Sequence, residues 1–345
     1  MKLPFLSLLL GCACGIATSA VADPTGPYHA IAHYPIAGDG GYDYLRIDPI
    51  DRRLYVAHEK KVDVLDVDSG KPIGTISGLV RAHGIALANE AGHGFATSGI
   101  DNQVTMFDLK NLQVLRVIKS TGSNPDAIEF DPGTKRIYAA NHGSGEITVI
   151  DPTSGDVLGT VHFGEGKLEG IAFDGRGHGY VNAEDKSSVF VFDLKTLQPL
   201  AKWSLAPGEG GTGLAVDAKH HRVFSSCSNN HLVVLDSDSG KVIATPAIGA
   251  DPDGLAYDEK TKRIFSTNSD ETLSIVQQNS ADDYTTLQTV TTQAGCRTIT
   301  LDTKTGNIAT CAPKFGPRPV AVAGGPRPRP PILPGTFEAF LIGTN

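Results

Sequence analysis

Val62-Asp63-Val64-Leu65-Asp66 is an alternating apolar segment that ends in aspartate, and the same pattern returns along the chain. The later copies are Val104-Thr105-Met106-Phe107-Asp108, Ile147-Thr148-Val149-Ile150-Asp151, Val189-Phe190-Val191-Phe192-Asp193 and Leu232-Val233-Val234-Leu235-Asp236. Their final aspartates are 42, 43, 42 and 43 residues apart. A period in the forties that contains several short strands is typical of the blades of a β-propeller.

The unit from Asn124 to Val161 shows how one blade is built. It contains four predicted strands separated by turns, namely Asp126–Phe130, Arg136–Ala140, Glu146–Ile150 and Val157–Val161. Pro132 and Gly133 favour a tight turn between the first two strands, because proline fixes its own φ and glycine accepts a positive φ. A four-stranded meander with two apolar faces buries both only by stacking between neighbours, so we expect a ring.

Five further units follow this plan: Tyr42–Ile76, Ala82–Ile118, Leu168–Leu205, Thr212–Ile248 and Pro252–Val290. The seventh has only three strands in order along the chain, which are Cys296–Leu301, Asn307–Cys311 and Phe337–Ile342. The N-terminal segment Tyr28–Ile36 is available as its fourth strand, and this pairing removes two exposed sheet edges. The sequence therefore predicts an all-β, seven-bladed β-propeller of four-stranded antiparallel blades, closed by an N-terminal strand, with residues 23–345 as one domain.

The second strand of each blade carries a four-residue motif. It appears as Tyr55-Val56-Ala57-His58, Phe95-Ala96-Thr97-Ser98, Tyr138-Ala139-Ala140-Asn141, Tyr180-Val181-Asn182-Ala183, Phe224-Ser225-Ser226-Cys227, Phe265-Ser266-Thr267-Asn268 and, degenerate, Ala309-Thr310-Cys311-Ala312. With these repeats the chain resembles the YVTN-repeat β-propellers, in particular exported YncE-like proteins. The resemblance implies a propeller in an exported protein and leaves the activity open, since most members have no established reaction.

The N-terminus reads as a secretory signal over residues 1–22, with an apolar stretch after Lys2 and the small residues Ala20-Val21-Ala22 before Asp23. An alternative interpretation takes Leu9-Leu10-Gly11-Cys12 as a lipidation box, which would anchor the protein at Cys12. We expect a periplasmic or extracellular location in either case. The net charge of −8 argues against nucleic acid as the main partner, and no long apolar run after the leader predicts a transmembrane segment.

One position recurs at the start of the first strand of every blade and is predicted to face the mouth of the central channel. Its occupants are Asp43, His83, Asp126, Glu169, Thr212, Asp253 and Arg297. Such a ring could bind a small polar ligand. Asp43, Asp126, Glu169, Asp253 and His83 are candidate ligands for a divalent cation, because carboxylates suit Ca²⁺ or Mg²⁺ and imidazole admits a transition metal. The alternative is a set of polar residues that bind neighbouring blades and channel water.

The cysteines suggest a crosslink in the last blade. Cys296 begins its first predicted strand and Cys311 ends its second, so an antiparallel hairpin would bring them near each other, and an exported protein permits oxidation. We therefore predict a Cys296–Cys311 disulfide. Cys227 is expected to be a buried free thiol.

Residues 313–335 form a proline-rich insertion in the seventh blade, and they include Arg318, Arg327 and Arg329. Eight prolines in this range exclude a regular ladder here. The segment is predicted to be a semi-rigid loop packed over one face of the ring. A functional interpretation makes it a lid over the channel or an arm that docks a partner.

These features favour a monomeric, non-catalytic binding or scaffold protein whose channel face takes a small ligand or an exported envelope protein. No haem-binding cysteine pair and no Ser-His-Asp arrangement can be assigned. The alternative is a metal-dependent hydrolase of the lactonase kind that uses the acidic ring. A structural envelope component that docks partners on its outer strands is a third interpretation.

Overall fold

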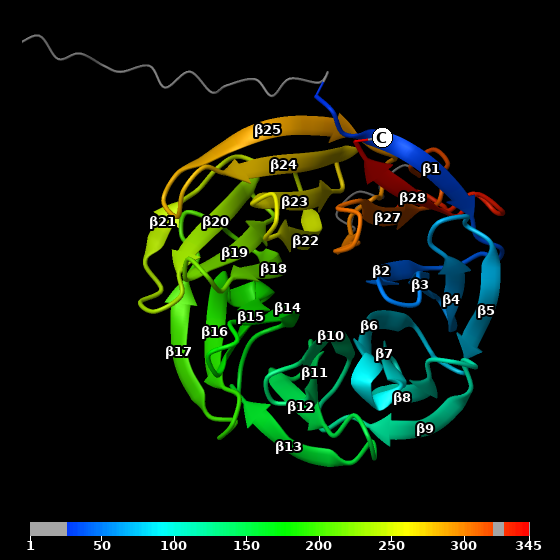
Figure 1. Ribbon diagram of the computed structural model, residues 1–345, viewed down its shortest axis with the longest axis horizontal. Helices are drawn as coiled ribbons and strands as arrows, with labels where there is room; N and C mark the ends of the chain where they lie inside the picture. The colour runs from blue at the N-terminus through cyan, green and yellow to red at the C-terminus, as the bar shows by residue number, and fades with distance from the viewer. Residues whose placement is uncertain (1–25, 320–327, 345) are drawn as a thin grey trace, which may run out of the picture.

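The computed structural model describes residues 26–319 and 328–344, which form seven four-stranded antiparallel sheets arranged in a ring (Figure 1). This confirms the predicted seven-bladed β-propeller. The predicted signal peptide and residues 320–327 of the proline-rich insertion lie outside the described residues. No α-helix occurs within the two described ranges, where only the 3-10 turns η1 (Asn89–Ala91) and η2 (Glu184–Lys186) interrupt the strands.

Six blades are continuous in sequence, and each runs from the channel outwards. The first three are β2 (Tyr42–Asp48), β3 (Arg53–His58), β4 (Lys61–Asp66) and β5 (Pro72–Ser77); β6 (Ala82–Ala88), β7 (His93–Ser98), β8 (Gln103–Asp108) and β9 (Val114–Lys119); and β10 (Pro125–Asp131), β11 (Arg136–Asn141), β12 (Glu146–Ile150) and β13 (Val157–His162). The next three are β14 (Leu168–Phe173), β15 (His178–Ala183), β16 (Ser188–Asp193) and β17 (Pro199–Ser204); β18 (Gly211–Asp217), β19 (Arg222–Cys227), β20 (His231–Asp236) and β21 (Val242–Ala244); and β22 (Pro252–Asp258), β23 (Arg263–Asn268), β24 (Thr272–Gln278) and β25 (Tyr284–Thr291).

The seventh blade joins the two ends of the chain, as the sequence predicts. Its strand order is β1 (His29–Pro35), β28 (Glu338–Gly343), β27 (Ile308–Ala312) and β26 (Thr300–Leu301), and the blue β1 lies beside the red β28 in Figure 1. The predicted first strand Cys296–Leu301 is wrong in extent, because only its last two residues pair. The preceding backbone bonds elsewhere: the carbonyl of Arg297 accepts from the amide of Asp253 at 3.2 Å.

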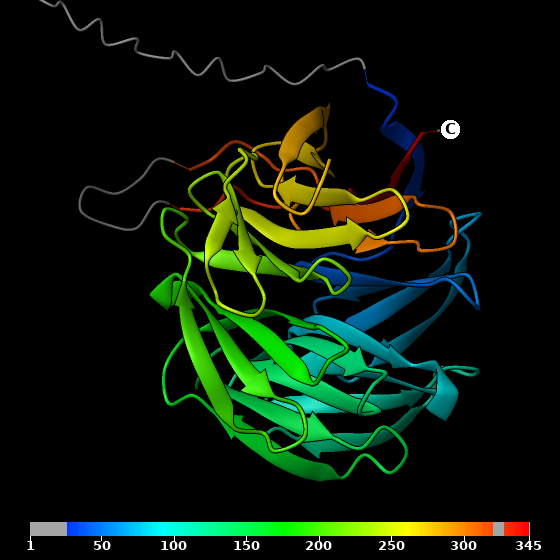
Figure 2. The same cartoon turned by 60° about the vertical axis from the view of Figure 1, so that its left-hand side comes forward.

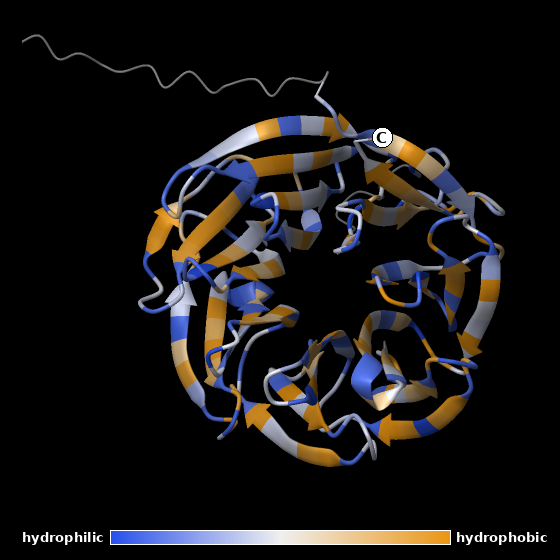
Figure 3. Cartoon of the chain, viewed as in Figure 1, coloured by the Kyte–Doolittle hydropathy of each residue, from blue (hydrophilic) through white to orange (hydrophobic). Residues whose placement is uncertain are grey.

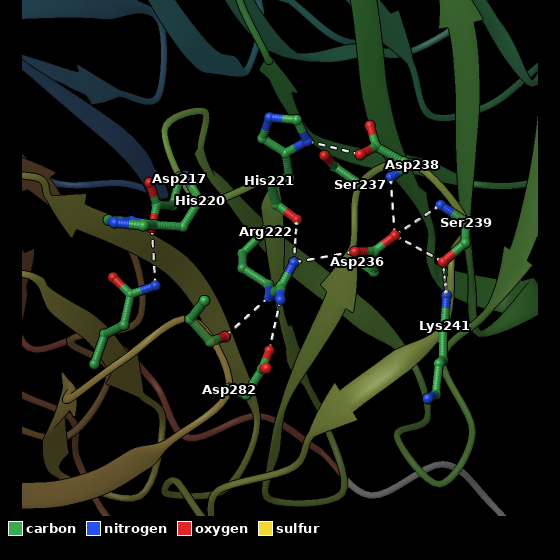
Figure 4. Close-up of polar contacts among 12 residues, drawn as sticks. Asp217, His220, His221, Arg222, Asp236, Ser237, Asp238, Ser239, Lys241 and Asp282 are labelled. Carbon is green, nitrogen blue, oxygen red and sulfur yellow. Dashed lines mark hydrogen bonds and ion pairs between the residues drawn. The ribbon is translucent and has the colours of Figure 1, made fainter.

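The recurring aspartates stabilise turns, which explains why they recur although the rest of the repeat varies. The carboxylates at the ends of the third strands accept hydrogen bonds from the amide three residues later. These pairs are Asp66–Ser69 (2.8 Å), Asp108–Asn111 (2.9 Å), Asp151–Ser154 (2.8 Å), Asp193–Thr196 (2.6 Å) and Asp236–Ser239 (2.9 Å). The last of these turns appears in Figure 4. Each aspartate fixes the turn that sends the chain into the outermost strand of its blade.

The four-residue motif also has a physical basis. Its aromatic first residues are fully buried between blades at Tyr55, Phe95, Tyr138, Tyr180, Phe224 and Phe265. Its polar third residues donate to a carbonyl of the next blade in three cases: Thr97 to Asp126 at 2.6 Å, Asn182 to Thr212 at 2.9 Å, and Thr267 to Arg297 at 2.7 Å. Every one of these carbonyls belongs to a residue of the predicted channel ring. The motif therefore positions the backbone of that ring from the blade before it.

Neighbouring inner strands approach closely at glycines that follow the ring residues. A Cβ on Gly84 would lie 2.6 Å from the carbonyl oxygen of Asp126, and a Cβ on Gly170 would lie 2.5 Å from that of Thr212. Both distances are shorter than a van der Waals contact. The atoms involved belong to the backbone, which cannot rotate out of the way as a side chain can. Glycine at these points permits the narrow inner end of the ring.

Apolar side chains from adjacent blades form the core, and Figure 3 shows apolar residues recurring along the strands throughout the ring. One cluster joins Tyr138 and Val149 of the third blade to Val181 and Phe192 of the fourth. Burial between blades, as a repeat architecture requires, thus provides the main stabilisation. Within the described residues, no helix has the length and apolarity needed to span a membrane.

The predicted Cys296–Cys311 disulfide is wrong, since both cysteines and Cys227 are free and buried in the structure. Cys296 packs with Ala312 and Phe340, whereas Cys311 belongs to a different cluster on the side of the first blade. Successive residues of a strand point to opposite faces, so a thiol that packs against residue 312 faces away from residue 311. Cys311 occupies the third place of the motif, and its Sγ lies 3.8 Å from the carbonyl oxygen of Asp43, the ring residue of the next blade. From the same place in their own blades, Thr97 and Thr267 donate to the carbonyls of Asp126 and Arg297.

Candidate functional site

All seven residues of the predicted ring line one cavity of about 970 Å³ at the channel mouth. Six of them stand at the start of an inner strand, β2, β6, β10, β14, β18 or β22, and Arg297 lies just before β26. The structure therefore brings Asp43, His83, Asp126, Glu169, Thr212, Asp253 and Arg297 together, although ligand binding by them stays a prediction. Thr212 contributes least, because its hydroxyl is engaged by the Pro252 carbonyl at 2.7 Å.

Arg297 neutralises one side of the ring. Its guanidinium forms an ion pair with Asp253 and lies 3.4 Å from the Asp43 carboxylate. The same group stands over the ring of Tyr42, 5.8 Å from its centroid. Burial disfavours the charge on Asp43, but Arg297 and the His83 ring together lower the pKa of Asp43 below its ordinary value. Arg297 thus compensates the charges of Asp43 and Asp253.

His83 lies between two carboxylates. Its Nδ1 contacts Asp43 and is 3.7 Å from Oδ2 of Asp126. Burial disfavours the charged ring, but the hydrogen bond to Asp43 and the charge of Asp126 raise the pKa of His83 above its ordinary value. Its Nε2 is buried and has no hydrogen-bond partner among the described residues.

Asp126 and Glu169 form the uncompensated side of the ring. Burial, reinforced by Asp43, raises the pKa of Asp126 to about 6. Burial and the charges of Asp126 and Asp43 raise the pKa of Glu169 well above its ordinary range. The Tyr44 hydroxyl lies 3.4 Å from Glu169 Oε2, and burial raises the pKa of this phenol as well. These two carboxyl groups favour a proton or a cation, because no guanidinium of residues 26–319 or 328–344 forms an ion pair with them.

His142 is a member of the site that the sequence did not identify. It lies in the turn between β11 and β12, and its Nδ1 is 2.8 Å from Oε1 of Glu169. The ligand atoms of Asp43, His83 and Asp126 lie within 4.8 Å of one another, and so do those of Asp126, His142 and Glu169. Asp253, a predicted metal ligand, belongs to neither group.

A fixed offset could have located His142. The residue directly after the four-residue motif lines the cavity in four blades, as Glu59, His142, Glu184 and Ser269. The turn between second and third strands lies on the same face as the entry to the first strand, so this position forms an outer tier above the ring. Aligning the repeats at the residue directly after the motif would therefore have identified His142 as a candidate residue of the site.

The proline-rich insertion reaches the same cavity. Phe315, Arg318, Arg329 and Ile332 contribute to its lining. Phe315 and Ile332 form a β-bridge, with the Gly316 amide donating to the Pro331 carbonyl at 2.8 Å. In Figure 2 the described ends of this insertion leave the ring side by side. Its predicted position on the face of the carboxylate ring agrees with this lining, whereas a lid function stays a prediction.

Below the mouth, the channel continues as a second cavity of about 470 Å³, which shares Tyr44 and Asp253 with the first. Its walls are mostly apolar or glycine residues of the inner strands. An ion pair between Arg46 and Glu129 crosses it from the first blade to the third. Burial, partly offset by Arg46, raises the pKa of Glu129. The acidic cluster therefore belongs to one end of the channel.

A separate polar network between the fifth and sixth blades has a structural role (Figure 4). Arg222 binds Asp236 at 3.1 Å and Asp282 at 2.5 Å, and it donates to the Ala281 carbonyl at 2.9 Å. These residues line neither cavity. The network ties two blades together at their outer turns.

Comparisons with known proteins support the fold. No protein-family model matches the chain, and no curated protein matches it. Among solved structures, the hydrazine synthase of Kuenenia stuttgartiensis is similar, with a TM-score of 0.69 and 16% sequence identity. The match covers 80% of this chain and 94% of that chain. At this identity the likeness extends to the propeller architecture alone.

Proposed function

We propose that this protein is an exported, YncE-like propeller that binds a small polar ligand in the channel-mouth cavity without changing it covalently. The observation that carries this proposal is the convergence of seven polar side chains, one from each blade, on a single cavity of about 970 Å³. A concave site of this volume suits a small molecule. The propeller fold fits such a binding role.

The charges of the cavity define the ligand that it suits. Asp126 and Glu169 lie on one side and Arg297 on the other, while Arg81, Arg318 and Arg329 line the rim. The carboxylates would complement a cationic or hydroxyl-rich part of a ligand, and the guanidinium groups would complement an anionic part. An envelope protein that inserts a polar loop would use the same groups, but a volume of about 970 Å³ is also sufficient for a free small molecule.

Membership of the YVTN-repeat group is proposed on the roles of the motif residues. The aromatic first position fills the space between blades, and the polar third position binds the next blade at Thr97, Asn182 and Thr267. These roles explain why the motif varies within narrow limits. This resemblance implies an exported protein, and we propose that it is a monomer.

Blocking the mouth tests the proposal. Ser269 is an exposed residue of the cavity rim, so Ser269→Trp should fill the entrance without touching the ring. Lys110→Trp adds the same side chain at an exposed turn outside both cavities and serves as the control. Native mass spectrometry of protein isolated from cells should reveal a small-molecule adduct on the wild type and on Lys110→Trp, and none on Ser269→Trp. An adduct on all three, or on none, refutes the proposal.

The second candidate is a metal-dependent hydrolase of the lactonase kind. It is favoured by the two groups of histidine and carboxylate ligands that share Asp126, because a metal ion can activate water for hydrolysis. Hydrolysis of simple lactones by the Zn²⁺- or Mn²⁺-loaded wild type, lost in Asp126→Asn, would support this candidate. Intact lactone after prolonged incubation with the loaded protein would exclude it for that substrate class.

A further inference from the structure

The charge distribution of the ring leaves one carboxylate, that of Asp126, without a hydrogen bond from the described residues. Asp126 is only 8% exposed, and its carboxylate accepts no hydrogen bond from residues 26–319 or 328–344. The nearest cationic group is His83 Nδ1 at 3.7 Å. An isolated buried charge is costly, and proteins therefore pair such groups or bind metal ions with them.

Imidazoles stand on both sides of this carboxylate. His83 approaches from the second blade and His142 from the turn after β11. Asp43 and Glu169 complete two three-residue groups, and Asp126 is common to both, with the ligand atoms of each group within 4.8 Å. A bound ion in either group would therefore use Asp126.

His83 adds a nitrogen ligand to the first of these groups. Its ring is only 4% exposed, and Nδ1 faces the carboxylates of Asp43 and Asp126. Metal-binding histidines use one ring nitrogen for the ion, and here Nδ1 would exchange its contact with Asp43 for that ion. The adjoining cavity has room for water.

We infer that the channel mouth contains a divalent transition-metal site built on Asp126, with Asp43 and His83 on one side and His142 and Glu169 on the other. The mixture of imidazole and carboxylate suits Zn²⁺ or Mn²⁺ better than Ca²⁺, which takes six to eight oxygen ligands. Three protein ligands per group leave coordination positions for water or for a ligand. This inference deepens the proposed function, because the ion would supply the positive centre at the floor of the binding cavity.

The test is isothermal titration calorimetry of the EDTA-treated protein, from Asp23 onwards, with Zn²⁺, Mn²⁺ and Ca²⁺ in turn. We expect Zn²⁺ or Mn²⁺ to bind more tightly than Ca²⁺. Asp126→Asn should weaken that binding by more than about 100-fold, because even outer-shell partners of a metal ligand contribute about 10- to 100-fold. Glu184→Gln and Asp251→Asn remove a carboxylate from the same cavity but outside both groups, and they should change affinity less than about threefold.

Two further measurements separate the possible failures. Circular dichroism and thermal unfolding of Asp126→Asn establish that the variant is folded, and anomalous scattering at the zinc edge should place the ion beside Asp126. Absence of Zn²⁺ and Mn²⁺ binding, equal binding by Asp126→Asn, or an ion located elsewhere overturns the inference. A metal-free protein that still carries an adduct sensitive to Ser269→Trp would leave the proposed function standing while removing the metal.

Discussion

Replacing Asp126 by asparagine should stabilise the metal-free protein at neutral pH. Burial raises the pKa of this carboxyl to about 6, against 3.8 for an ordinary aspartate. The folded state therefore holds the proton more tightly than the unfolded state, so the wild type loses stability as the pH rises from about 4 to about 6. Asparagine keeps the shape of the side chain and has no charge to bury.

The magnitude follows from the shift. A difference of about 2 pKa units corresponds to about 3 kcal/mol at full ionisation, of which about 2 kcal/mol develops between pH 4.5 and pH 7.5. In the variant His83 loses one of its two carboxylate neighbours, and this loss cancels part of the gain in stability. We therefore expect Asp126→Asn to gain about 1–2 kcal/mol over the wild type on going from pH 4.5 to pH 7.5.

Thermal unfolding in EDTA at the two pH values measures this difference. For a domain of this length the gain corresponds to about 2–3 °C in Tm. Asp251→Asn is the matched control, because Asp251 is exposed in the same cavity and its replacement should give no pH-dependent gain. Equal Tm differences for Asp126→Asn at both pH values, or a loss of stability at pH 7.5 alone, would refute the electrostatic reasoning.

Two further predictions concern the framework of the ring. Gly170→Ala should lower the free energy of unfolding by about 1–3 kcal/mol in a denaturant titration, because the new methyl group meets the Thr212 carbonyl; Gly133→Ala, where the nearest atom would be 3.4 Å away, should change it by less than about 0.5 kcal/mol. Alkylation in denaturant without reductant should modify all three cysteines of the protein that begins at Asp23, because the thiols are free. In the native protein Cys296 and Cys311 should react slowly, since burial raises the pKa of Cys296 to about 12 and that of Cys311 well above its ordinary value; a native mass two hydrogens lighter would contradict this.

The fold was predictable because the repeat records local physical requirements. A turn-capping aspartate such as Asp66 is needed wherever the third strand turns, and a buried aromatic such as Tyr55 is needed wherever two blades meet. The ring position was predictable for the same reason, since it recurs five residues before the aspartate slot that follows the first strand of each blade, as Asp43 does before Asp48. Strand count and closure followed from the missing fourth strand of the last blade.

The remaining details depend on contacts that a repeat does not record. His142 joins the site because a turn brings it over Glu169, and only a comparison of the turns between blades would have located it. The disulfide prediction failed because proximity along a hairpin does not specify which face each thiol occupies. Arg297 divides the carboxylates into a compensated and an uncompensated half, a property of side-chain reach that alignment of positions does not reveal.

The pairing of β1 with β28 has a consequence for synthesis of the protein. The partner of residues 29–35 spans residues 338–343, so the first strand to be made waits for almost the last. Until β28 has been synthesised, six blades form an open arc whose terminal faces expose apolar surface and unpaired backbone, both prone to aggregation. A product truncated before residue 338 would remain in that state, which makes synthesis of β28 the step that closes the ring.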